Sequence, residues 1–395
     1  MKKTRVGILF GGRSGEHEVS LLSAASVLKA IDREKYEVVP IGITKAGRWV
    51  TAAHAERLLY PVEATGGTQL RAGDPAATAA AAVLRKGESV IVPPMPSEAM
   101  APFQSDAGAL AHNNSDHVLS VDVIFPVLHG TFGEDGTIQG LFELAGIAYV
   151  GSGVLGSATG MDKDAMKRLF GSAKLPIVKW VTFLRAEWEK NPKTIRARIE
   201  GALNYPVFVK PANLGSSVGI SKAHNHLELG PAIELAAQFD RKIVVEQAVG
   251  GKSRKARELE VAVLGNDEPE ASVVGEVVPV KEFYDYEAKY LSEGSDLIVP
   301  AKLTRRQTKQ VREMAIAAFR SCDCAGLARV DFLMEPGKTG RIYVNEINTL
   351  PGFTSISMYP RLWAASGVEY PHLIDRLIQL AIERRADQDR NRYSL

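Results

Sequence analysis

Cysteine and long apolar runs are scarce in this sequence, and each shortage excludes a class of protein. Among 395 residues the only cysteines are Cys322 and Cys324, which excludes the disulfide framework of a small secreted domain. No apolar stretch approaches the about 18 residues that a membrane-spanning helix requires. We therefore expect two buried, unreactive thiols and a reducing, cytoplasmic location.

A surplus of charge of one sign is also missing. Lys plus Arg number 48 and Asp plus Glu number 46, which leaves a net charge of +2. This balance predicts neither nucleic acid nor a membrane surface as a partner. The opening Met-Lys-Lys is followed by Val6–Phe10, an apolar run that is too short for a signal peptide and that we interpret as a first β-strand.

What the sequence does contain is an alternation of strand and helix patterns. Val6–Phe10 and Glu37–Ile43 are typical of buried parallel strands, and Ser20–Ile31 between them carries apolar residues at helical spacing. The alternation predicts an α/β domain with an open parallel sheet over residues 1–150. The pattern weakens over about residues 60–116, which we interpret as an elaboration of that domain.

The remaining chain predicts two further parts, residues 151–246 and residues 247–395, so the fold class is α/β with an α+β C-terminal part. The strands expected there are Tyr205–Lys210, Lys242–Glu246, Glu258–Leu264, Ser272–Val278, Arg329–Met334 and Arg341–Ile347. Helices are expected from about Met161 and over Arg305–Arg320 and Tyr370–Arg385.

The clearest chemical signal is a pair of consecutive strands joined by turn residues. Period-two alternation places Arg329 and Asp331 on one face of the first strand, and Glu346 and Asn348 on one face of the second. The turn-rich connection 335–340 predicts an antiparallel hairpin in which these side chains converge. Oxygen ligands on rigid strands suit Mg²⁺. The alternative interpretation is a solvated sheet face with a surface ion pair.

A lysine that precedes a Gly/Ser loop forms a second candidate site. Lys210 ends an apolar strand, and the loop Gly215–Gly219 follows it. Such a loop can offer backbone N–H groups, and the lysine a point charge, to phosphates; the alternative is an ordinary connector. The loop also matches the G-x-S-x-G nucleophile elbow, but residues 211–213 separate it from the strand, which disfavours a serine hydrolase.

Two familiar nucleotide-binding motifs are incomplete. Gly251-Lys252-Ser253 and Gly337-Lys338-Thr339 resemble the end of a P-loop, but Glu246 and Phe332 stand where that motif requires a glycine. The loop after the first strand, Gly11–Gly15, does not have the G-x-G-x-x-G spacing of a dinucleotide site.

Candidate substrate contacts follow two strands of the predicted N-terminal sheet. The segment Gly11–Ser20 contains Glu16, whose carboxylate can bind an ammonium group or can merely complement the helix dipole. His129 ends the strand Val121–Leu128 and is either a substrate contact or a structural histidine. The aromatic and charged segment Phe283–Tyr290 is either a loop that closes over a site or a surface hairpin.

Taken together and in this order, these segments resemble the D-alanine–D-alanine ligases of the ATP-grasp superfamily over nearly the whole chain. The segments that carry the resemblance are Gly11–Ser20, His129-Gly130, Lys210-Pro211, Gly215–Gly219, Tyr284–Tyr290, Arg329–Asp331, Asn345–Thr349 and Pro351-Gly352. The resemblance implies three domains, with ATP held between the two sheets of the central and C-terminal parts and with residues 281–299 as a closing loop. It also implies ATP-driven joining of two D-alanines through an acyl phosphate, for bacterial peptidoglycan.

The resemblance further implies a role for each matching residue. The implied ATP contacts are Lys163, Lys210, Ser216, Glu246, Val249, Glu258 and Lys289. The implied ligands of Mg²⁺, for two ions that Mn²⁺ can replace, are Asp331, Glu346 and Asn348. The implied D-alanine contacts are Glu16, His129, Ser357 and Met358. The implied catalytic groups are Arg329 and the backbone N–H of Gly352, which stabilise the oxyanion, and Glu16, Ser216 and Tyr290, which tie the loop shut.

Other functions remain as alternatives. A D-alanine–D-lactate ligase or another ATP-grasp carboxylate–amine ligase would share most of these residues. Tyr290 at the end of Glu287–Tyr290 resembles the amide-forming enzymes, which favours D-alanine as the acceptor. A nucleotide-binding regulator without catalysis would not need both metal carboxylates and Arg329. A homodimer is expected from the resemblance alone.

Overall fold

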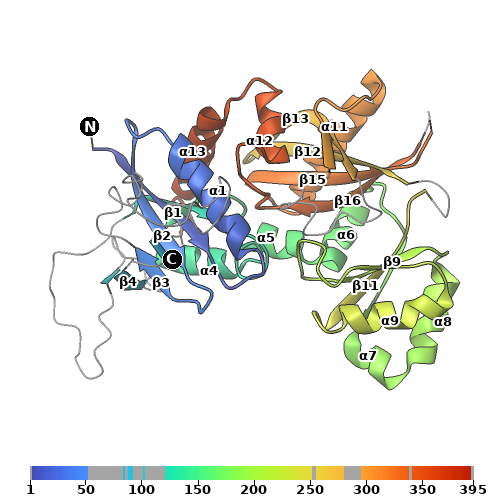
Figure 1. Cartoon of the computed structure of the whole chain (residues 1–395). Helices are drawn as coiled ribbons and strands as arrows, with labels where there is room; N and C mark the ends of the chain where they lie inside the picture. The colour runs from blue at the N-terminus through green and yellow to red at the C-terminus, as the bar shows by residue number, and fades with distance from the viewer. Residues whose placement is uncertain are drawn as a thin grey trace, which may run out of the picture. The chain divides into compact units, whose positions relative to one another are not determined.

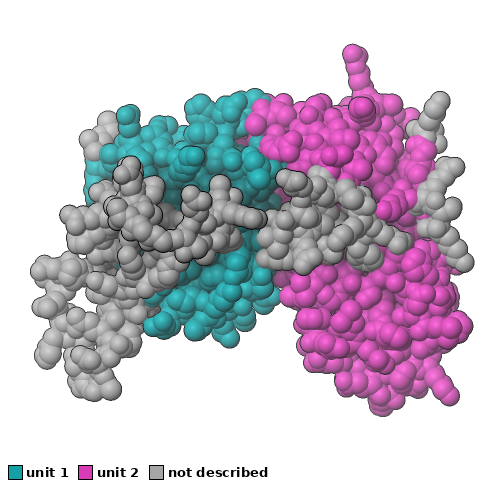
Figure 2. Space-filling model, viewed as in Figure 1, with its two compact units in different colours: residues 1–154, 350–360, 367–395 teal, residues 155–349, 361–366 magenta. Residues whose placement is uncertain are grey.

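The computed structural model describes residues 2–51, 83–84, 88–91, 101–102, 121–250, 255–279, 295–337 and 340–392. The chain separates into two compact units, shown in teal and magenta in Figure 2: unit 1 is residues 1–154, 350–360 and 367–395, and unit 2 is residues 155–349 and 361–366. Most of the elaboration at 60–116 and of the expected closing loop, including Lys289 and Tyr290, lies outside the described residues. No helix among them combines the length and apolarity needed to span a bilayer.

Unit 1 is built on one mixed sheet with strand order β5-β4-β3-β2-β1-β6-β7. Its strands are β1 (Thr4–Gly11), β2 (Tyr36–Ile43), β3 (Trp49–Thr51), β4 (Glu88–Ile91), β5 (Ala101–Pro102), β6 (Val123–Val127) and β7 (Ala148–Tyr149). Strands β2, β1, β6 and β7 are parallel, as the sequence predicts, while β3, β4 and β5 add an antiparallel edge.

Helices cover both faces of this sheet (Figure 1). They are α1 (His17–Ala30), α4 (Thr137–Ala145) and α13 (Tyr370–Gln388). On one face Leu9 and Ile41 pack with Ile138 and Phe142 of α4 in a single buried cluster. Because successive strand residues point to opposite faces, the alternate residues, such as Phe10, point to the other face.

The C-terminal helix α13 returns to the N-terminal unit. The hydroxyl of Tyr36 at the start of β2 donates a 2.6 Å hydrogen bond to Asp375, and Gln379 donates to the Tyr36 hydroxyl over 3.1 Å. Arg384 donates to the Tyr149 carbonyl over 3.2 Å and stacks on the Tyr149 ring at 4.3 Å. Residues more than 300 positions apart in the chain thus complete one core.

Unit 2 contains two separate antiparallel sheets, with strand orders β10-β9-β11-β8 and β14-β13-β12-β15-β16. The first sheet consists of β8 (Trp180–Leu184), β9 (Val207–Pro211), β10 (Ser221–Ala223) and β11 (Lys242–Gln247). The second consists of β12 (Arg257–Gly265), β13 (Glu270–Pro279), β14 (Ser295–Ile298), β15 (Gly326–Met334) and β16 (Ile342–Asn348). The helices of the unit are α5 (Val154–Met161), α6 (Lys163–Ser172), α7 (Arg185–Lys190), α8 (Pro192–Ala202), α9 (His226–Ala236) and α11 (Arg305–Ser321), and α12 (Met358–Ala364) joins the two units.

Each sheet of unit 2 has one apolar face and one face with ionisable side chains. In the first sheet Val209 and Val245 pack with α8 and α9 in a buried cluster, so that Lys210 and Glu246 point to the opposite face. In the second sheet Val330 and Phe332 pack with Phe319 of α11. The ionisable faces are therefore those opposite α8 and α9 in the first sheet and opposite α11 in the second.

The sequence predicts these elements well where periodicity is strong. The expected antiparallel hairpin is confirmed, because β15 and β16 pair antiparallel. Cys322 and Cys324 are both buried free thiols, and burial raises the pKa of Cys322 to about 12. The mixed α/β class is confirmed by the three sheets, whereas the division into three domains stays a prediction.

Candidate functional site

The β15–β16 hairpin brings the predicted metal ligands together. In its register Arg329 lies opposite Asn348 and Asp331 lies opposite Glu346. A bulge between Asp331 and Phe332 sets this register, and it leaves Asn345 as the extra residue of β16. All four polar side chains are half-buried, whereas Val330 between them is fully buried. The hairpin therefore presents one arginine, two carboxylates and one amide on the same face.

Arg329 is held by two carboxylates. Its Nε and Nη2 donate to the two oxygens of Asp331 over 2.7 Å each, a bidentate pair. Its Nε also lies 3.0 Å from Oε2 of Glu260, which sits on β12 directly opposite Asp331. These side chains are 10–15% exposed, so the guanidinium is fixed in place rather than free in solvent. Sequence reasoning missed Glu260, because its place beside Arg329 depends on cross-strand register.

The oxygen ligands of the hairpin fit a magnesium ion whose remaining ligands are substrate phosphates and water. Within the described ranges no three His, Cys, Asp or Glu side chains are arranged to hold a metal ion alone. Asp331, Glu346 and Asn348 offer hard oxygen donors, and each carboxylate oxygen has two lone pairs, so the pair with Arg329 leaves acceptor capacity. Mg²⁺ is usually bound by one or two protein carboxylates together with substrate phosphates and water. Two carboxylates and an amide suit that pattern.

A buried charge cluster lies on the ionisable face of the first sheet of unit 2, to which α6 contributes a lysine. Lys210 Nζ on β9 lies 2.8 Å from Oε2 of Glu246 on β11. Lys167 Nζ on α6 lies 3.2 Å from Oε1 of the same carboxylate. The side chain of Lys167 is 0% exposed and that of Glu246 is 4% exposed. Two ammonium groups thus share one carboxylate, and the three side chains together carry a net charge of +1.

Burial and the neighbouring charges together set the pKa values of the three side chains in this cluster. Burial opposes ionisation of Glu246, but Lys167 and Lys210 outweigh it and hold the pKa of Glu246 at about 2. Burial would also lower the pKa of Lys210, yet Glu246 and then Glu346 raise it above its ordinary value. Burial prevails at Lys167, whose pKa is lowered. Glu346 belongs to the hairpin, and the two ionisable faces of unit 2 are also linked through α6, because Met166, the neighbour of Lys167, accepts the Ile347 N–H of β16 over 3.3 Å.

The Gly/Ser loop starts directly beside this cluster. Lys163, the first residue of α6, donates from Nζ to the carbonyl of Leu214 over 2.7 Å, and its backbone N–H donates to Ala212 over 3.0 Å. Ser216 and Ser217 have φ values of 48° and 58°, the left-handed region in which successive N–H groups can face an anion. The loop is thus anchored by a lysine at the position where the sequence predicts a phosphate contact.

Two further ATP contacts implied by the resemblance lie on elements that flank these faces. Val249 follows the end of β11 and is half-buried, and Glu258 lies on the ionisable face of the second sheet, opposite Leu333. The charge of Glu258 also raises the pKa of Lys210. Glu246, another implied ATP contact, has its carboxylate paired with Lys167 and Lys210.

In unit 1, Glu16 and His129 are linked through one serine. Ser14 Oγ donates to the carbonyl of His129 over 2.7 Å and accepts from the backbone N–H of Glu16 over 3.3 Å. Glu16 is 7% exposed, and a Cβ at Gly130 would lie 2.8 Å from its Oε2. Gly130 is therefore needed for the close approach of the Glu16 carboxylate.

His129 is a neutral, internally bonded side chain. Its Nδ1 lies 2.9 Å from the carbonyl oxygen of Leu350, which only accepts, so Nδ1 carries the proton. Its Nε2 lies 3.3 Å from Ser23 Oγ and accepts from it. Burial lowers the pKa of His129 to about 4, which keeps the ring uncharged at neutral pH. Both nitrogens are used within unit 1, which favours a positioning role over a charged substrate contact.

The segment that follows β16 completes this part of unit 1. Phe353 N–H donates to Ser23 Oγ over 3.4 Å, and the Phe353 ring packs on Tyr370 with centroids 5.5 Å apart. Gly352 precedes it, and Ser357 Oγ lies 2.7 Å from Thr354 Oγ1. Met358 begins α12 and is buried. The structure thus brings Glu16, His129, Gly352, Ser357 and Met358 into one unit.

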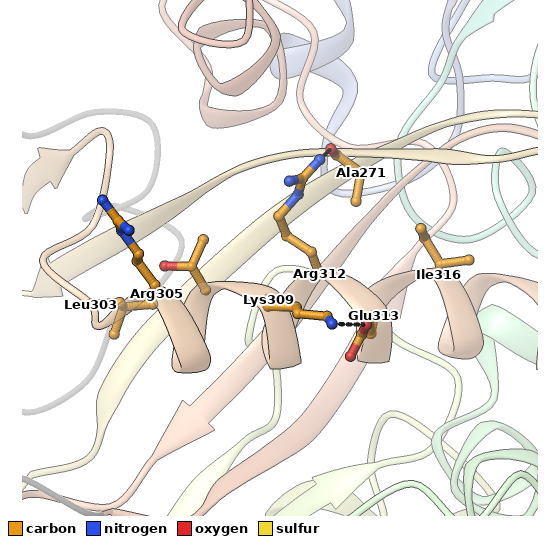
Figure 3. A pocket seen from close by; sticks show the side chains of 8 residues that line it. Ala271, Leu303, Arg305, Lys309, Arg312, Glu313 and Ile316 are labelled. Carbon is orange, nitrogen blue, oxygen red and sulfur yellow. Dashed lines mark hydrogen bonds and ion pairs between the residues drawn. The ribbon is translucent and has the colours of Figure 1, made fainter.

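A groove on unit 2 lies outside all these residues. It has a volume of about 460 Å³ and is lined by α11 and β13 (Figure 3). Its cations do not converge: Arg312 donates to the Ala271 carbonyl over 2.7 Å, Lys309 pairs with Glu313 at 3.8 Å, and Arg305 points away from them. Such an arrangement offers no single anion-binding point.

Comparison with known proteins agrees with this arrangement. A family model described as the D-ala D-ala ligase N-terminus matches residues 5–152, and one described as the D-ala D-ala ligase C-terminus matches residues 169–379. The D-alanine--D-alanine ligase of Chloroherpeton thalassium is 48% identical over 392 residues, which cover 98% of this chain and 99% of that protein. The chain belongs to the D-alanine–D-alanine ligase family.

Solved structures share the fold over nearly the whole chain. The D-alanine-D-alanine ligase from Coxiella burnetii has a TM-score of 0.79 and 32% identity, and the match covers 98% of this chain and 97% of that one. The VanG D-Ala:D-Ser ligase from Enterococcus faecalis has a TM-score of 0.78 and 34% identity, covering 96% of this chain and 100% of that one.

Proposed function

We propose that this chain uses ATP to join two D-alanines into D-alanyl-D-alanine, a building block of peptidoglycan. The observation that carries the proposal is that α6 contacts both ionisable faces of unit 2: its Lys167 pairs with Glu246, and Met166 beside it accepts the backbone N–H of Ile347, which follows Glu346. A cationic face and an oxygen-donor face that one helix contacts suit a nucleotide triphosphate with its divalent ion. The family of the chain supports the same reaction.

In the proposed reaction the carboxylate of the first D-alanine takes the γ-phosphoryl group of ATP, and ADP leaves. The resulting acyl phosphate has a good leaving group, which the free carboxylate lacks. The amine of the second D-alanine then attacks the acyl carbon and loses a proton, and inorganic phosphate leaves as the amide forms. The intermediate reacts with water if it is exposed, so the site must exclude solvent while both steps proceed.

Unit 2 supplies the groups that handle phosphate. Lys163 and Lys210 bind the phosphates, with the loop at Ser216 closing on them. Glu246 and Val249 contact the base and Glu258 contacts the ribose, and the carboxylate of Glu246 also pairs with Lys167 and Lys210. Arg329, fixed by Asp331 and Glu260, stabilises the developing oxyanion.

The metal and the amino-acid substrates use the remaining residues of the resemblance. Two Mg²⁺ ions, which Mn²⁺ can replace, would be held by Asp331, Glu346 and Asn348 and would neutralise phosphate charge when bound. The proposed contacts of the two D-alanines are Glu16, His129, Gly352, Ser357 and Met358. Lys289 and Tyr290 complete the proposed site and lie outside the described residues.

The direct test is phosphate release from ATP and Mg²⁺ with and without D-alanine, followed by mass analysis of the product. We expect release to depend on D-alanine and the product to be the dipeptide. Release that responds only to a different amino acid would identify another carboxylate–amine ligase. No release with any amino acid would favour a nucleotide-binding regulator.

The identity of the second substrate, which accepts the acyl group, is tested by a separate competition experiment. The structural neighbour from Enterococcus faecalis is a D-Ala:D-Ser ligase, so a fold of this kind accommodates a second substrate other than D-alanine. D-Alanine, D-serine and D-lactate should therefore compete in one reaction, with the three products separated by mass. We expect the dipeptide of D-alanine to dominate, and a larger yield of either other product would correct the acceptor.

We further propose three domains, residues 1–150, 151–246 and 247–395, a cytoplasmic location and a homodimer. The first boundary of unit 2 and its two separate sheets support divisions near residues 150 and 246, whereas residues 350–360 and 367–395 belong to unit 1. Sedimentation of the purified chain tests the dimer, and a single monomeric boundary over the accessible concentration range would exclude it.

A further inference from the structure

A cavity in unit 1 lies at the carboxyl ends of parallel strands β2, β1 and β6. It has a volume of about 370 Å³. Gly11 at the end of β1, Ile43 at the end of β2 and Leu128 after β6 belong to its lining. Open α/β sheets bind ligands at this edge, and a volume above roughly 300 Å³ is sufficient for a small organic molecule. The position and the size are those of a binding site.

The lining is largely apolar. Trp49 and Phe132 are its aromatic members, and Ile138 and Leu141 of α4 contribute aliphatic surface. Phe132 is 46% exposed, although a benzyl group of this size is usually covered in a folded protein. A ligand that buried this surface would gain hydrophobic free energy in proportion to the area covered.

Phe132 is held in a strained conformation at the cavity. Its φ is 68°, in the left-handed region that bulky side chains rarely adopt, and its N–H donates to Asp135 over 2.8 Å. A glycine or asparagine would occupy this turn without strain. Strained backbone positions cluster at binding sites, so the aromatic ring is a candidate ligand contact.

Arg13 is the one cation among the described residues of the lining. Its guanidinium carbon lies 5.2 Å from the centroid of the Phe132 ring. No hydrogen bond or ion pair joins it to another residue that the structure describes. A stacked guanidinium binds a carboxylate through two parallel N–H···O bonds.

We propose that this cavity binds a small aromatic carboxylate, with its ring on the apolar lining at Trp49 and Phe132 and its carboxylate on Arg13. Of the proposed D-alanine contacts, the described lining contains His129 but not Glu16, Gly352 or Ser357. The inference does not depend on the proposed function, because the residues that carry it, Arg13, Trp49 and Phe132, have no assigned role in the reaction.

The test uses 2-naphthoate as the probe in titration calorimetry with the full chain. We expect saturable binding in the millimolar range or tighter, and at least tenfold weaker binding of the neutral 2-naphthamide. Arg13→Met should weaken 2-naphthoate at least tenfold while retaining the side-chain stem. Arg48→Met, at an exposed arginine outside the lining, is the matched control and should bind as the parent chain does.

A second variant guards against misfolding of Arg13→Met. Thr137→Glu places a carboxylate in the lining at the first residue of α4, where a negative charge suits the helix dipole. It should repel the probe and leave the melting temperature unchanged or higher. Equal affinity of the parent chain and both variants, no saturable binding, or displacement of the probe by D-alanine or ADP would each overturn the proposal.

Discussion

At the scale of single residues, one buried side chain of this protein must be charged and another must be neutral. Lys167 must be charged to pair with Glu246, whereas His129 must be neutral to fit its hydrogen bonds. Both side chains are buried, so water cannot stabilise the wrong protonation state of either one. The free energy of unfolding should therefore change measurably when the charge of either side chain changes.

Removal of the Lys167 charge should destabilise unit 2. In Lys167→Met the carboxylate of Glu246 keeps only Lys210, and loss of one partner from a buried ion pair typically costs about 3 kcal/mol or more. Urea unfolding measures the change in free energy. The exposed Lys193→Met is the control and should change it by less than about 0.5 kcal/mol. Equal losses in both variants would contradict the assigned role of Lys167.

Protonation of His129 should make stability fall in mild acid. Burial lowers its pKa from 6.5 to about 4, so between these pH values the unfolded chain binds a proton that the folded chain does not. The contribution is complete above pH 6.5 and is lost as the pH falls to 4, for a total of about 3 kcal/mol. Unfolding free energies of the parent chain and His129→Gln should therefore converge over this range. A difference in unfolding free energy between the parent chain and His129→Gln that stays constant with pH would show that His129 does not cause the loss. The same conclusion would follow if the exposed variant His224→Gln also converged with the parent chain.

At the scale of elements, the turn between β1 and α1 depends on one glycine. Gly11 has φ 91°, and a Cβ there would lie 2.2 Å from the Ile43 carbonyl oxygen, a backbone atom that cannot move aside. We expect Gly11→Ala to destabilise the chain by more than about 2 kcal/mol, measured by thermal unfolding. Gly15→Ala is the matched control, because nothing lies within 4 Å of its Cβ position. Similar melting temperatures for the two variants would refute the steric argument.

The β15–β16 hairpin gives a test of the metal proposal. Glu346→Gln keeps the shape of the side chain but removes one of two carboxylates, so the Mg²⁺ concentration for half-maximal phosphate release should rise at least about tenfold. Glu268→Gln, an exposed carboxylate in the turn between β12 and β13, should leave it unchanged. A Glu346→Gln enzyme with unaltered Mg²⁺ dependence would remove this residue from the ligand set.

Local periodicity accounts for what the sequence predicts of these elements. The alternation around Val330 and Phe332 specifies both the strand and the face that carries Arg329 and Asp331, and β15 has that burial pattern. Lys167 was missed because the apolar pattern of α6 conceals it, although its spacing of four residues from Lys163 places both on one helix face. Glu260 was missed because the pairing register of β12 and β15 is not specified by any sequence pattern near either strand.

At the scale of the whole molecule, the discontinuity of unit 1 is the feature that local patterns do not predict. The periodicity of 370–385 correctly predicts the helix α13, but not its docking against strands that lie over 200 residues earlier. Contacts such as Tyr36 with Asp375 are specified only by the complete core. The two compact units therefore differ from any simple division of the sequence.

Removal of the last segment of unit 1 should unfold that unit selectively. A chain that ends at residue 366 lacks Leu373, Ile374, Leu377 and Ile378, each 0% exposed. At about 1.5–3 kcal/mol per buried side chain the loss is roughly 6–12 kcal/mol, comparable with the whole stability of a domain. Limited proteolysis should cut within 1–154 before 155–349. A chain that ends at Gln388 keeps α13 and should resist like the parent, whereas equal resistance of the shorter chain would contradict the prediction.

The return of α13 also sets an order of events during synthesis. After residue 154 leaves the ribosome, 370 − 154 = 216 further residues must be added before α13 begins to emerge. At roughly 5–20 residues per second this takes about 10–40 s, during which the nascent N-terminal sheet lacks its final cover. The middle of the chain, whose sheets need little from the last segment, is free to fold first. Translation speed and holdase chaperones should therefore govern the yield of this protein more than its equilibrium stability does.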